Sequence, residues 1–425
     1  MEYKLDIDND LSIATKWPKK AKILFGTFLI ISILTIIALI ILVILYSKHS
    51  PDENSKEKEN ESTNLSVYDF LISKKTNLTY DEDEKIKNSF KSEGENYNEN
   101  IGNLNNGLDY SKNARNVYNL YIPQTALDRK DKTVGVILWI HGGAWMGGNP
   151  ENMEPFCLFA SNQGYITASM GYTLLINYFQ DFNIYRILDE VTECIKAIKN
   201  ELIKSGFKED KLILGIGGYS AGAHLALLYS YLIQNINIIP IKFVINICGP
   251  IGLRIKYFYK LKSGIKAFDE AVMKDISAIE KAKEDGTIIP TFPDMQGLIY
   301  MNAFYGNKYT DEELNSMLYE NGTINYENEN YKKMEKFDKN AFVTEIEDKH
   351  KLPTLCVYGG IDDVVGVAAF AYLKQKMDKD KRPYDFVYSK TEGHLPIIPT
   401  SKEGKEQLIK ISQKIIEYFH KYFGY

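Results

Sequence analysis

One pentapeptide, Gly218-Tyr219-Ser220-Ala221-Gly222, has the residue types and spacing of a nucleophile on a sharp turn. It follows a short apolar run at residues 211–216 and precedes an Ala- and Leu-rich run at 221–232, which predicts a strand, a turn and a helix. Such a turn would present the serine hydroxyl and the first backbone N–H groups of the helix to the same point, where an anion can be stabilised. The pattern therefore indicates nucleophilic catalysis by Ser220, with an ordinary glycine turn before a packed helix as the alternative.

A second glycine motif, His141-Gly142-Gly143-Ala144-Trp145, follows an apolar, β-branched run at residues 134–140. A glycine pair after a strand can turn unshielded backbone N–H groups toward a ligand oxygen. Together the two motifs resemble the H-G-G esterase branch of the α/β-hydrolase superfamily, which includes carboxylesterases and hormone-sensitive-lipase-like, feruloyl-esterase-like and formamidase-like enzymes. The resemblance extends in motif order over residues 113–422 and does not include the N-terminal region.

A serine nucleophile needs a base, and the base needs a third group to fix its tautomer. Of the six histidines, His394 lies in a loop directly after a late strand, which is predicted over residues 384–389. The other five are placed elsewhere: His49 in a polar segment, His141 in the glycine motif, His224 in the predicted helix, and His350 and His420 among lysines. His394 is therefore predicted to be the base, with a surface or capping histidine as the alternative.

The acid is expected before His394 and after the preceding strand, predicted over residues 352–358. An aspartate pair, Asp362 and Asp363, follows that strand, and one of the two is expected to be a turn or cap residue. The resemblance favours Asp362, because the segment 358–362, Tyr-Gly-Gly-Ile-Asp, aligns with the H-G-x-x-D pattern of the family with tyrosine in place of histidine. Asp363 is the second choice. The resulting chain order of serine, aspartate and histidine is that of α/β-hydrolases.

The resemblance also implies an oxyanion hole made of the backbone N–H groups of Gly142, Gly143 and Ala221. Such donors would meet the charge that develops on a tetrahedral intermediate. Trp145 and Tyr219 are expected to line the substrate pocket, and a core position is the alternative for Trp145.

Strands and helices alternate along most of the chain from residue 113, which predicts the α/β class with a mostly parallel sheet covered by helices on both faces. Further strands are predicted over 117–122, 165–170 and 243–248, and helices over 154–163, 183–205 and 408–423. The interval from about 251 to 340 interrupts the alternation, with helical patterns at 266–283 and 311–320. By resemblance, it is a helical cap inserted into an α/β-hydrolase fold.

The N-terminal region has a different composition. Residues 23–46 contain no charged side chain, whereas a bilayer core needs about 20 apolar residues as a helix, and no small-residue cleavage site follows. We therefore expect an uncleaved transmembrane signal anchor in a single-pass membrane protein. Close to the span, four lysines precede it (Lys16, Lys19, Lys20 and Lys22) and three follow it (Lys48, Lys56 and Lys58), which predicts a short cytoplasmic tail and a catalytic domain on the non-cytoplasmic side. Residues 47–112 are predicted to be a polar, partly disordered stalk, with a short helix at 82–90, before the domain at 113–425.

Composition excludes some classes of function. A net charge of −5 in 425 residues gives no reason to expect a nucleic-acid partner. The four cysteines form no Cys-x-x-Cys pair and are expected to be buried free thiols; they are Cys157, Cys194, Cys248 and Cys356. No cofactor and no metal are expected.

These features predict a membrane-anchored serine hydrolase that cleaves a small-molecule ester or another acylated substrate through an acyl-enzyme intermediate. An amidase, a formamidase-like enzyme or a peptidase with the same triad is the neighbouring alternative. A non-catalytic binding module on a hydrolase fold is the alternative from another class. Neither the substrate nor the oligomeric state follows from the sequence.

Overall fold

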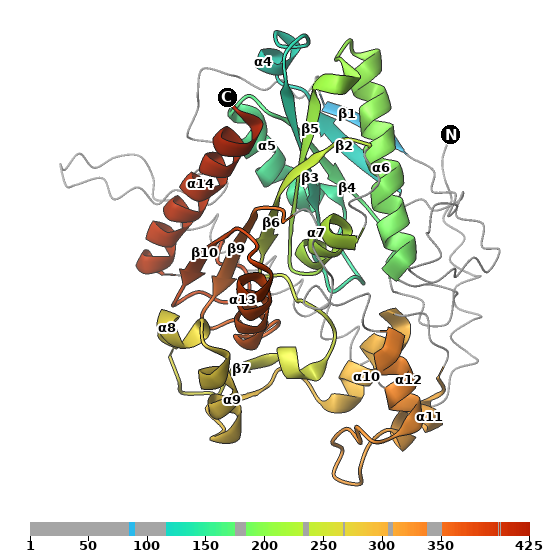
Figure 1. Ribbon diagram of the computed structural model, residues 1–425, viewed down its shortest axis with the longest axis vertical. Helices are drawn as coiled ribbons and strands as arrows, with labels where there is room; N and C mark the ends of the chain where they lie inside the picture. Colours follow the sequence, from blue (N-terminus) through green and yellow to red (C-terminus); the bar gives the residue numbers. More distant parts are fainter. Residues whose placement is uncertain are drawn as a thin grey trace, which may run out of the picture. The chain divides into compact units, whose positions relative to one another are not determined.

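The computed structural model describes residues 116–174, 184–232, 238–266, 268–304, 309–337, 351–397, 399 and 401–425, together with the backbone of residues 85–89. An eight-stranded sheet runs through them in the order β1-β2-β4-β3-β5-β6-β9-β10 (Figure 1). Its strands are β1 (Lys85–Ser89), β2 (Val117–Tyr121), β3 (Val134–Ile140), β4 (Ile166–Met170), β5 (Leu212–Tyr219), β6 (Ile241–Ile247), β9 (Thr354–Gly359) and β10 (Tyr384–Ser389). Pairing is parallel from β4 through β10, and β2 pairs antiparallel with both β1 and β4. The mostly parallel sheet predicted from the alternation is confirmed.

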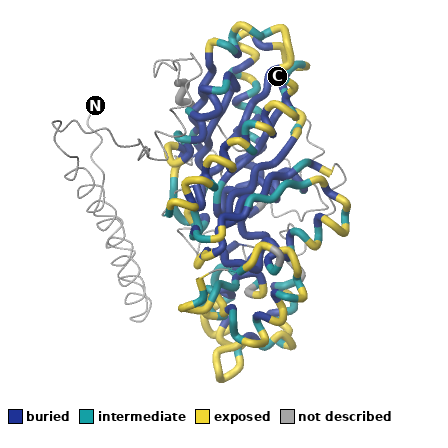
Figure 2. The backbone as a smooth tube through the Cα atoms, turned by 90° about the vertical axis from the view of Figure 1, so that its left-hand side faces the viewer, coloured by how far each residue is buried: buried dark blue, intermediate teal, exposed yellow. Residues whose placement is uncertain are grey.

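Helices cover both faces of this sheet. The five principal ones are α5 (Glu154–Asn162), α6 (Ile184–Lys204), α7 (Ala221–Leu232), α13 (Ala368–Asp380) and α14 (Lys402–Phe423); the shorter α4 (Gln124–Leu127), η4 (Pro150–Met153) and η5 (Glu209–Lys211) lie in connections. Successive side chains of a strand point to opposite faces. In β3, Val136 and Leu138 join the core cluster that contains α6, α7 and α13, whereas Ile137 and Trp139 join the cluster that contains α5 and α14. The central strands are therefore buried on both sides (Figure 2).

Parallel pairing brings the carboxyl ends of the strands to one edge of the sheet. Strand β5 ends directly before Ser220, and β3 ends directly before His141. Strands β9 and β10 end shortly before Asp362 and His394, respectively. The topology alone therefore brings together four loops that the sequence had marked for chemistry.

The predicted cap interval, between β6 and β9, contains a small two-stranded antiparallel sheet and several short helices (Figure 1). Its elements are η6 (Ile255–Tyr257), β7 (Tyr259–Leu261), α8 (Glu270–Met273), α9 (Ile276–Glu284), β8 (Ile288–Pro290), α10 (Asp294–Phe304), α11 (Asp311–Ser316) and α12 (Glu329–Phe337). The prediction of a helix over residues 266–283 is wrong, because two separate helices, α8 and α9, form there. Asp275 is extended, and its side chain accepts a hydrogen bond from the N–H of Ser277, so it begins a new helix there.

The N-terminal predictions lie almost entirely outside the described residues, including the span at 23–46, the tail and most of the stalk. The exception is β1, which forms where a short helix was expected at 82–90. Without β1, the backbone of β2 would be an open sheet edge, and an added strand satisfies its hydrogen-bonding groups. Among the helices that the structure describes, none is long and apolar enough to cross a membrane.

Candidate active site

Ser220 occupies the sharp turn between β5 and α7. Its φ of 52° lies in the left-handed region, which is strained for a residue with a side chain. Two backbone hydrogen bonds hold this conformation: the N–H of Ser220 donates to the carbonyl of Ile247 at 2.8 Å, and the N–H of His224 donates to the carbonyl of Ser220 at 3.1 Å. The surrounding backbone thus fixes the direction of the serine side chain.

The two glycines of the pentapeptide allow close contact between backbones. A Cβ atom on Gly222 would lie 2.0 Å from the carbonyl oxygen of Ile140 and 2.5 Å from that of His141. A Cβ on Gly218 would lie 2.5 Å from the same Ile140 oxygen. Because no side chain fits at either position, α7 packs directly against the end of β3, and the serine turn lies beside the second glycine motif.

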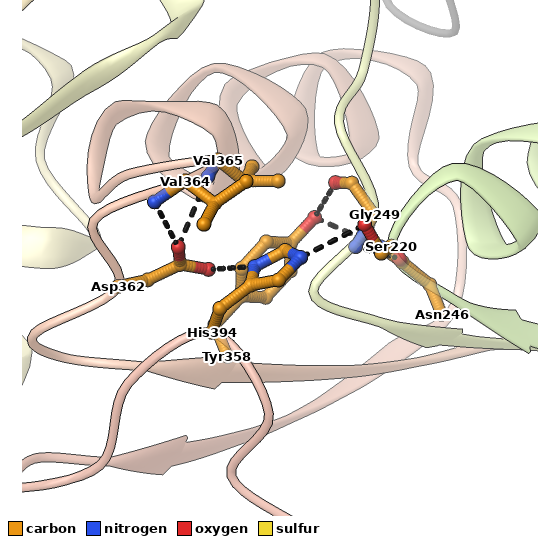
Figure 3. A network of polar contacts seen from close by, with 8 residues as sticks. All are labelled: Ser220, Asn246, Gly249, Tyr358, Asp362, Val364, Val365 and His394. Atoms are coloured by element: carbon orange, nitrogen blue, oxygen red, sulfur yellow. Dashed lines mark hydrogen bonds and ion pairs between the residues drawn. The ribbon is translucent and has the colours of Figure 1, made fainter. Parts of the chain in front are cut away.

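The three predicted triad residues form one hydrogen-bonded chain (Figure 3). The Nε2 atom of His394 lies 2.8 Å from Oγ of Ser220, and its Nδ1 atom lies 2.8 Å from Oδ2 of Asp362. Asp362 is fully buried, whereas the side chain of His394 is 17% exposed. Since a carboxylate only accepts, the neutral imidazole carries its proton on Nδ1 and presents the Nε2 lone pair to the serine hydroxyl.

The second oxygen of Asp362 is held by the backbone of its own loop. Oδ1 accepts hydrogen bonds from the N–H groups of Val364 at 2.9 Å and Val365 at 3.0 Å. These contacts orient the carboxylate and leave Oδ2 for His394. Asp363, the second choice from the sequence, is exposed.

The other described histidines have different surroundings. His141 is buried and stacks on Tyr172 with ring centroids 4.2 Å apart, and the Tyr172 hydroxyl donates to the His141 carbonyl. His224 is buried and contacts the rings of Trp145 and Phe304. His420 is exposed near the C-terminus, while His49 and His350 lie outside the described residues.

The glycine motif after β3 has an unusual backbone. Gly143, Ala144 and Trp145 have φ values of 113°, 51° and 59°, and the N–H groups of Met146 and Gly147 both donate to the Gly143 carbonyl at 2.9 Å. This tight loop turns the backbone sharply directly after the strand.

The residues predicted for the oxyanion hole lie on two adjoining backbones. A Cβ on Gly142 would lie 2.5 Å from the ring of Tyr219, so Gly142 contacts the residue before the serine. Gly143 follows in the same loop, and Ala221 is the first residue of α7. Backbone N–H groups at the start of a helix and in such a loop can stabilise a developing negative charge.

Trp145 and Tyr219 differ in burial. Trp145 is 5% exposed, and its ring packs against Phe304 of α10 at 5.0 Å and against His224 at 5.5 Å. It therefore lies in the hydrophobic core, and a contribution of Trp145 to a pocket wall stays a prediction. Tyr219 is only partly buried beside Gly142, and burial raises the pKa of its hydroxyl group.

Sequence reasoning missed a buried network beneath the triad, formed by Asn246, Gly249 and Tyr358 (Figure 3). The Tyr358 hydroxyl donates to the Gly249 carbonyl at 2.7 Å and accepts from Nδ2 of Asn246 at 2.9 Å. The N–H of Gly249 donates to Oδ1 of Asn246 at 2.9 Å. The network joins the ends of β6 and β9. Two features of the sequence could have indicated this network. Asn246 is a polar residue in an apolar strand, and Tyr358 stands at the family's histidine position.

Replacing Tyr358 by phenylalanine is expected to lower the free energy of unfolding by about 1–3 kcal/mol, because Gly249 and Asn246 would lose a buried hydrogen-bond partner. Urea denaturation measures the change. Tyr319→Phe is the control, since Tyr319 is 53% exposed and its substitution should change stability by less than about 0.5 kcal/mol. Equal stability of the two variants would show that the network contributes little.

Cys248 lies next to the triad. It follows β6 with a left-handed φ of 51° and is buried. Its sulfur, a carboxylate oxygen of Asp362 and a ring nitrogen of His394 all lie within 4.8 Å of one another. Burial, and then the charge of Asp362, raise the pKa of this thiol. All four cysteines are buried and form no disulfide, as predicted.

The sheet order, the serine turn and the hydrogen-bonded Ser220, His394 and Asp362 define an α/β-hydrolase. Residues 119–377 match the model of the BD-FAE family, an α/β-hydrolase esterase family, and the chain belongs to that family. It is accordingly a carboxylesterase-like hydrolase. No curated protein sequence matches the chain significantly.

Among solved structures, a bacterial heroin esterase is similar at 14% identity and a TM-score of 0.49, covering 83% of this chain and 90% of its own. A hyperthermophilic esterase from the archaeon Pyrobaculum calidifontis has 13% identity and a TM-score of 0.48, and the match covers 82% of this chain and 88% of the esterase. Esterase B from Lactobacillus rhamnosis has 15% identity and a TM-score of 0.45, and the match covers 83% of this chain and 91% of esterase B.

Proposed function

We propose that the protein hydrolyses carboxylic esters with Ser220 as nucleophile, His394 as general base and Asp362 as the group that orients the histidine. The observation that carries the proposal is the chain of two 2.8 Å contacts from the serine hydroxyl through the imidazole to a buried carboxylate. This is the arrangement that activates a hydroxyl whose own pKa is too high for it to ionise at neutral pH.

In the first half of the reaction, Oγ of Ser220 bonds to the ester carbonyl carbon while Nε2 of His394 takes the hydroxyl proton. The carbonyl oxygen then carries the negative charge, and we assign its stabilisation to the backbone N–H groups of Gly142, Gly143 and Ala221. Collapse of this intermediate breaks the bond to the alcohol oxygen, which takes the proton from the imidazolium. An acyl-enzyme remains on Ser220.

In the second half, a water molecule replaces the alcohol. His394 accepts a proton from the water as its oxygen attacks the acyl carbon, and the same proton returns to Oγ of Ser220 as the acid leaves. The charge on the imidazolium is balanced in both halves by the buried Asp362 carboxylate.

A fluorophosphonate probe tests the nucleophile directly. The wild-type protein is expected to bind one equivalent covalently at Ser220, identified by mass spectrometry of the labelled peptide, because the His394 contact activates this hydroxyl. Ser220→Ala should not be labelled. If the folded wild-type protein were unreactive, or labelled at another serine, a binding module on a hydrolase fold would be the better description.

We further propose that residues 23–46 anchor the domain in a membrane, with the catalytic domain on the non-cytoplasmic side. The absence of charge over this stretch supports insertion, since each central Leu or Ile contributes about −0.3 to −0.6 kcal/mol. The full-length protein should stay with membranes after a carbonate wash. A chain of residues 65–425, which keeps β1 paired with β2, should be released in soluble and active form. Full-length protein in the carbonate supernatant would contradict the anchor.

The proposed side of the membrane is tested separately. Protease added to right-side-out vesicles is expected to cleave the full-length protein in the predicted stalk, because the lysines of residues 1–22 favour a cytoplasmic tail. A marker protein inside the vesicles is the control for their integrity. Cleavage that occurs only after permeabilisation would reverse the orientation.

A further inference from the structure

We infer that Cys248, Asp362 and His394 form an inhibitory binding site for a thiophilic divalent cation such as Zn²⁺ or Cd²⁺. The inference rests on the proposed role of His394, since the bound cation would occupy the nitrogen that the base needs protonated. It adds to the hydrolase a metal-dependent off state that the triad by itself does not imply.

The geometry is close to that of a tetrahedral site. The three donor atoms already lie within 4.8 Å of one another. Bonds of about 2.3 Å to sulfur and about 2.0–2.1 Å to nitrogen place those two ligands roughly 3.5 Å apart in a tetrahedron. Side-chain movements of about 1 Å are therefore enough to close the site, with water as the fourth ligand.

The donor set suits this class of metal. A thiolate, an imidazole and a carboxylate are the three side-chain types that bind Zn²⁺, and the sulfur favours soft cations. Mg²⁺ and Ca²⁺ prefer six or more oxygen ligands, whereas this cluster offers one carboxylate. In the part of the chain that the structure describes, no second cluster of three such side chains comes as close together. His394 is the partly exposed member and provides the side of entry.

The ring nitrogen involved follows from the hydrogen bonds. Nδ1 of His394 faces Asp362 at 2.8 Å, so this nitrogen is the one beside the carboxylate, and we assign it as the ligand of the cation. When the cation binds the Nδ1 lone pair, the imidazole proton moves to Nε2, and the thiol proton of Cys248 is released to solvent. One proton therefore leaves the protein for each cation bound.

Inhibition follows from that change of tautomer. A proton on Nε2 leaves the imidazole without a lone pair toward Ser220, which lies 2.8 Å away. The base can then no longer take the serine proton, and the positive cation also cancels the charge of Asp362 that stabilises the imidazolium. Removal of the cation restores the original tautomer, so the inhibition is reversible.

The experiment titrates detergent-solubilised full-length protein with Cd²⁺ and with Zn²⁺. Ester hydrolysis is one readout, and the ultraviolet charge-transfer absorption of a cadmium–thiolate bond is the second. For the wild type we expect an absorption that saturates at one equivalent, a parallel loss of activity, and recovery of activity with EDTA. Mg²⁺ should have no effect at the same concentrations.

Two variants, each with one cysteine replaced by serine, locate the site. Cys248→Ser should lack the absorption and should need at least about tenfold more Cd²⁺ for half-inhibition, because one of three protein ligands is weakened. Cys356→Ser is the matched control, since Cys356 is also a buried free cysteine but lies outside the cluster; it should behave as wild type. Asp362→Asn should weaken the cadmium absorption without removing the thiol. Cys248→Ala serves as the second variant if the serine variant does not fold.

The outcomes are distinct. Inhibition of Cys248→Ser at the wild-type Cd²⁺ concentration, or a wild-type protein without the absorption, would overturn the site. A metal-free wild type that no fluorophosphonate labels would instead overturn the proposed esterase function, while the Cys248-dependent absorption would still report binding. Cadmium absorption without loss of activity would show that the cation binds but does not act on His394, and would overturn the inhibitory role.

Discussion

Replacing either Ser220 or His394 by alanine is expected to lower kcat/KM for ester hydrolysis by about 10⁴- to 10⁶-fold. The serine supplies the atom that becomes acylated, and the histidine, 2.8 Å away, supplies the base that makes this atom reactive. Neither function can be taken over by a neighbour, because the other described histidines are either buried elsewhere in the core or lie at the C-terminal surface.

The losses of kcat/KM caused by the two substitutions should not be additive. Once the nucleophile or its base is absent, the remaining member has no role, so the double variant should be about as slow as each single variant. Steady-state kinetics with a chromogenic ester measure all three. His420→Ala is the matched control, because this histidine is exposed, and it should retain nearly full activity. Near wild-type turnover of purified His394→Ala would exclude His394 as the base.

Much of the α/β core was predictable because its signals are local. The apolar run of β5, the glycines beside Ser220 and the Ala-rich start of α7 lie within twenty or so consecutive residues, and each demands one backbone conformation. Parallel pairing then determines where the loops meet. That is why the positions of Ser220 and His394 at one edge of the sheet followed from the order of elements alone.

The contacts that the sequence did not reveal are those between distant segments. Tyr358 bonds to Asn246 and Gly249, which are 112 and 109 residues away in the chain, and no local pattern marks such a pair. The cluster around Cys248 was missed for the same reason, because its neighbours Asp362 and His394 come from two other loops. The interval between β6 and β9 was recognised from its interruption of the alternation, but the antiparallel pair of β7 and β8 was missed because each strand is only three residues long.

The choice between the adjacent Asp362 and Asp363 is the clearest case in which the residues alone left two alternatives. It also concerns the second substitution for which a large loss of activity is expected. Replacing Asp362 by asparagine is expected to lower kcat by about 10⁴-fold. The backbone N–H groups of Val364 and Val365 both donate to Oδ1, so an asparagine must place its oxygen there and turn its NH₂ group toward His394. Nδ1 is then forced to accept, the imidazole proton moves to Nε2, and the base faces the serine in the wrong tautomer.

Asp363→Asn is the matched control, because the two residues are neighbours in one loop and the substitution removes the same charge. Asp363 is exposed, so its change should alter kcat less than about threefold, a shift of under about 0.7 kcal/mol in the activation free energy. Both variants should fold, since asparagine has nearly the shape of aspartate and can keep the two backbone hydrogen bonds at residue 362. A greater loss in Asp363→Asn would transfer the orienting role to Asp363. Equal and small losses would mean that His394 keeps its tautomer without a carboxylate, which the 2.8 Å contact to Asp362 argues against.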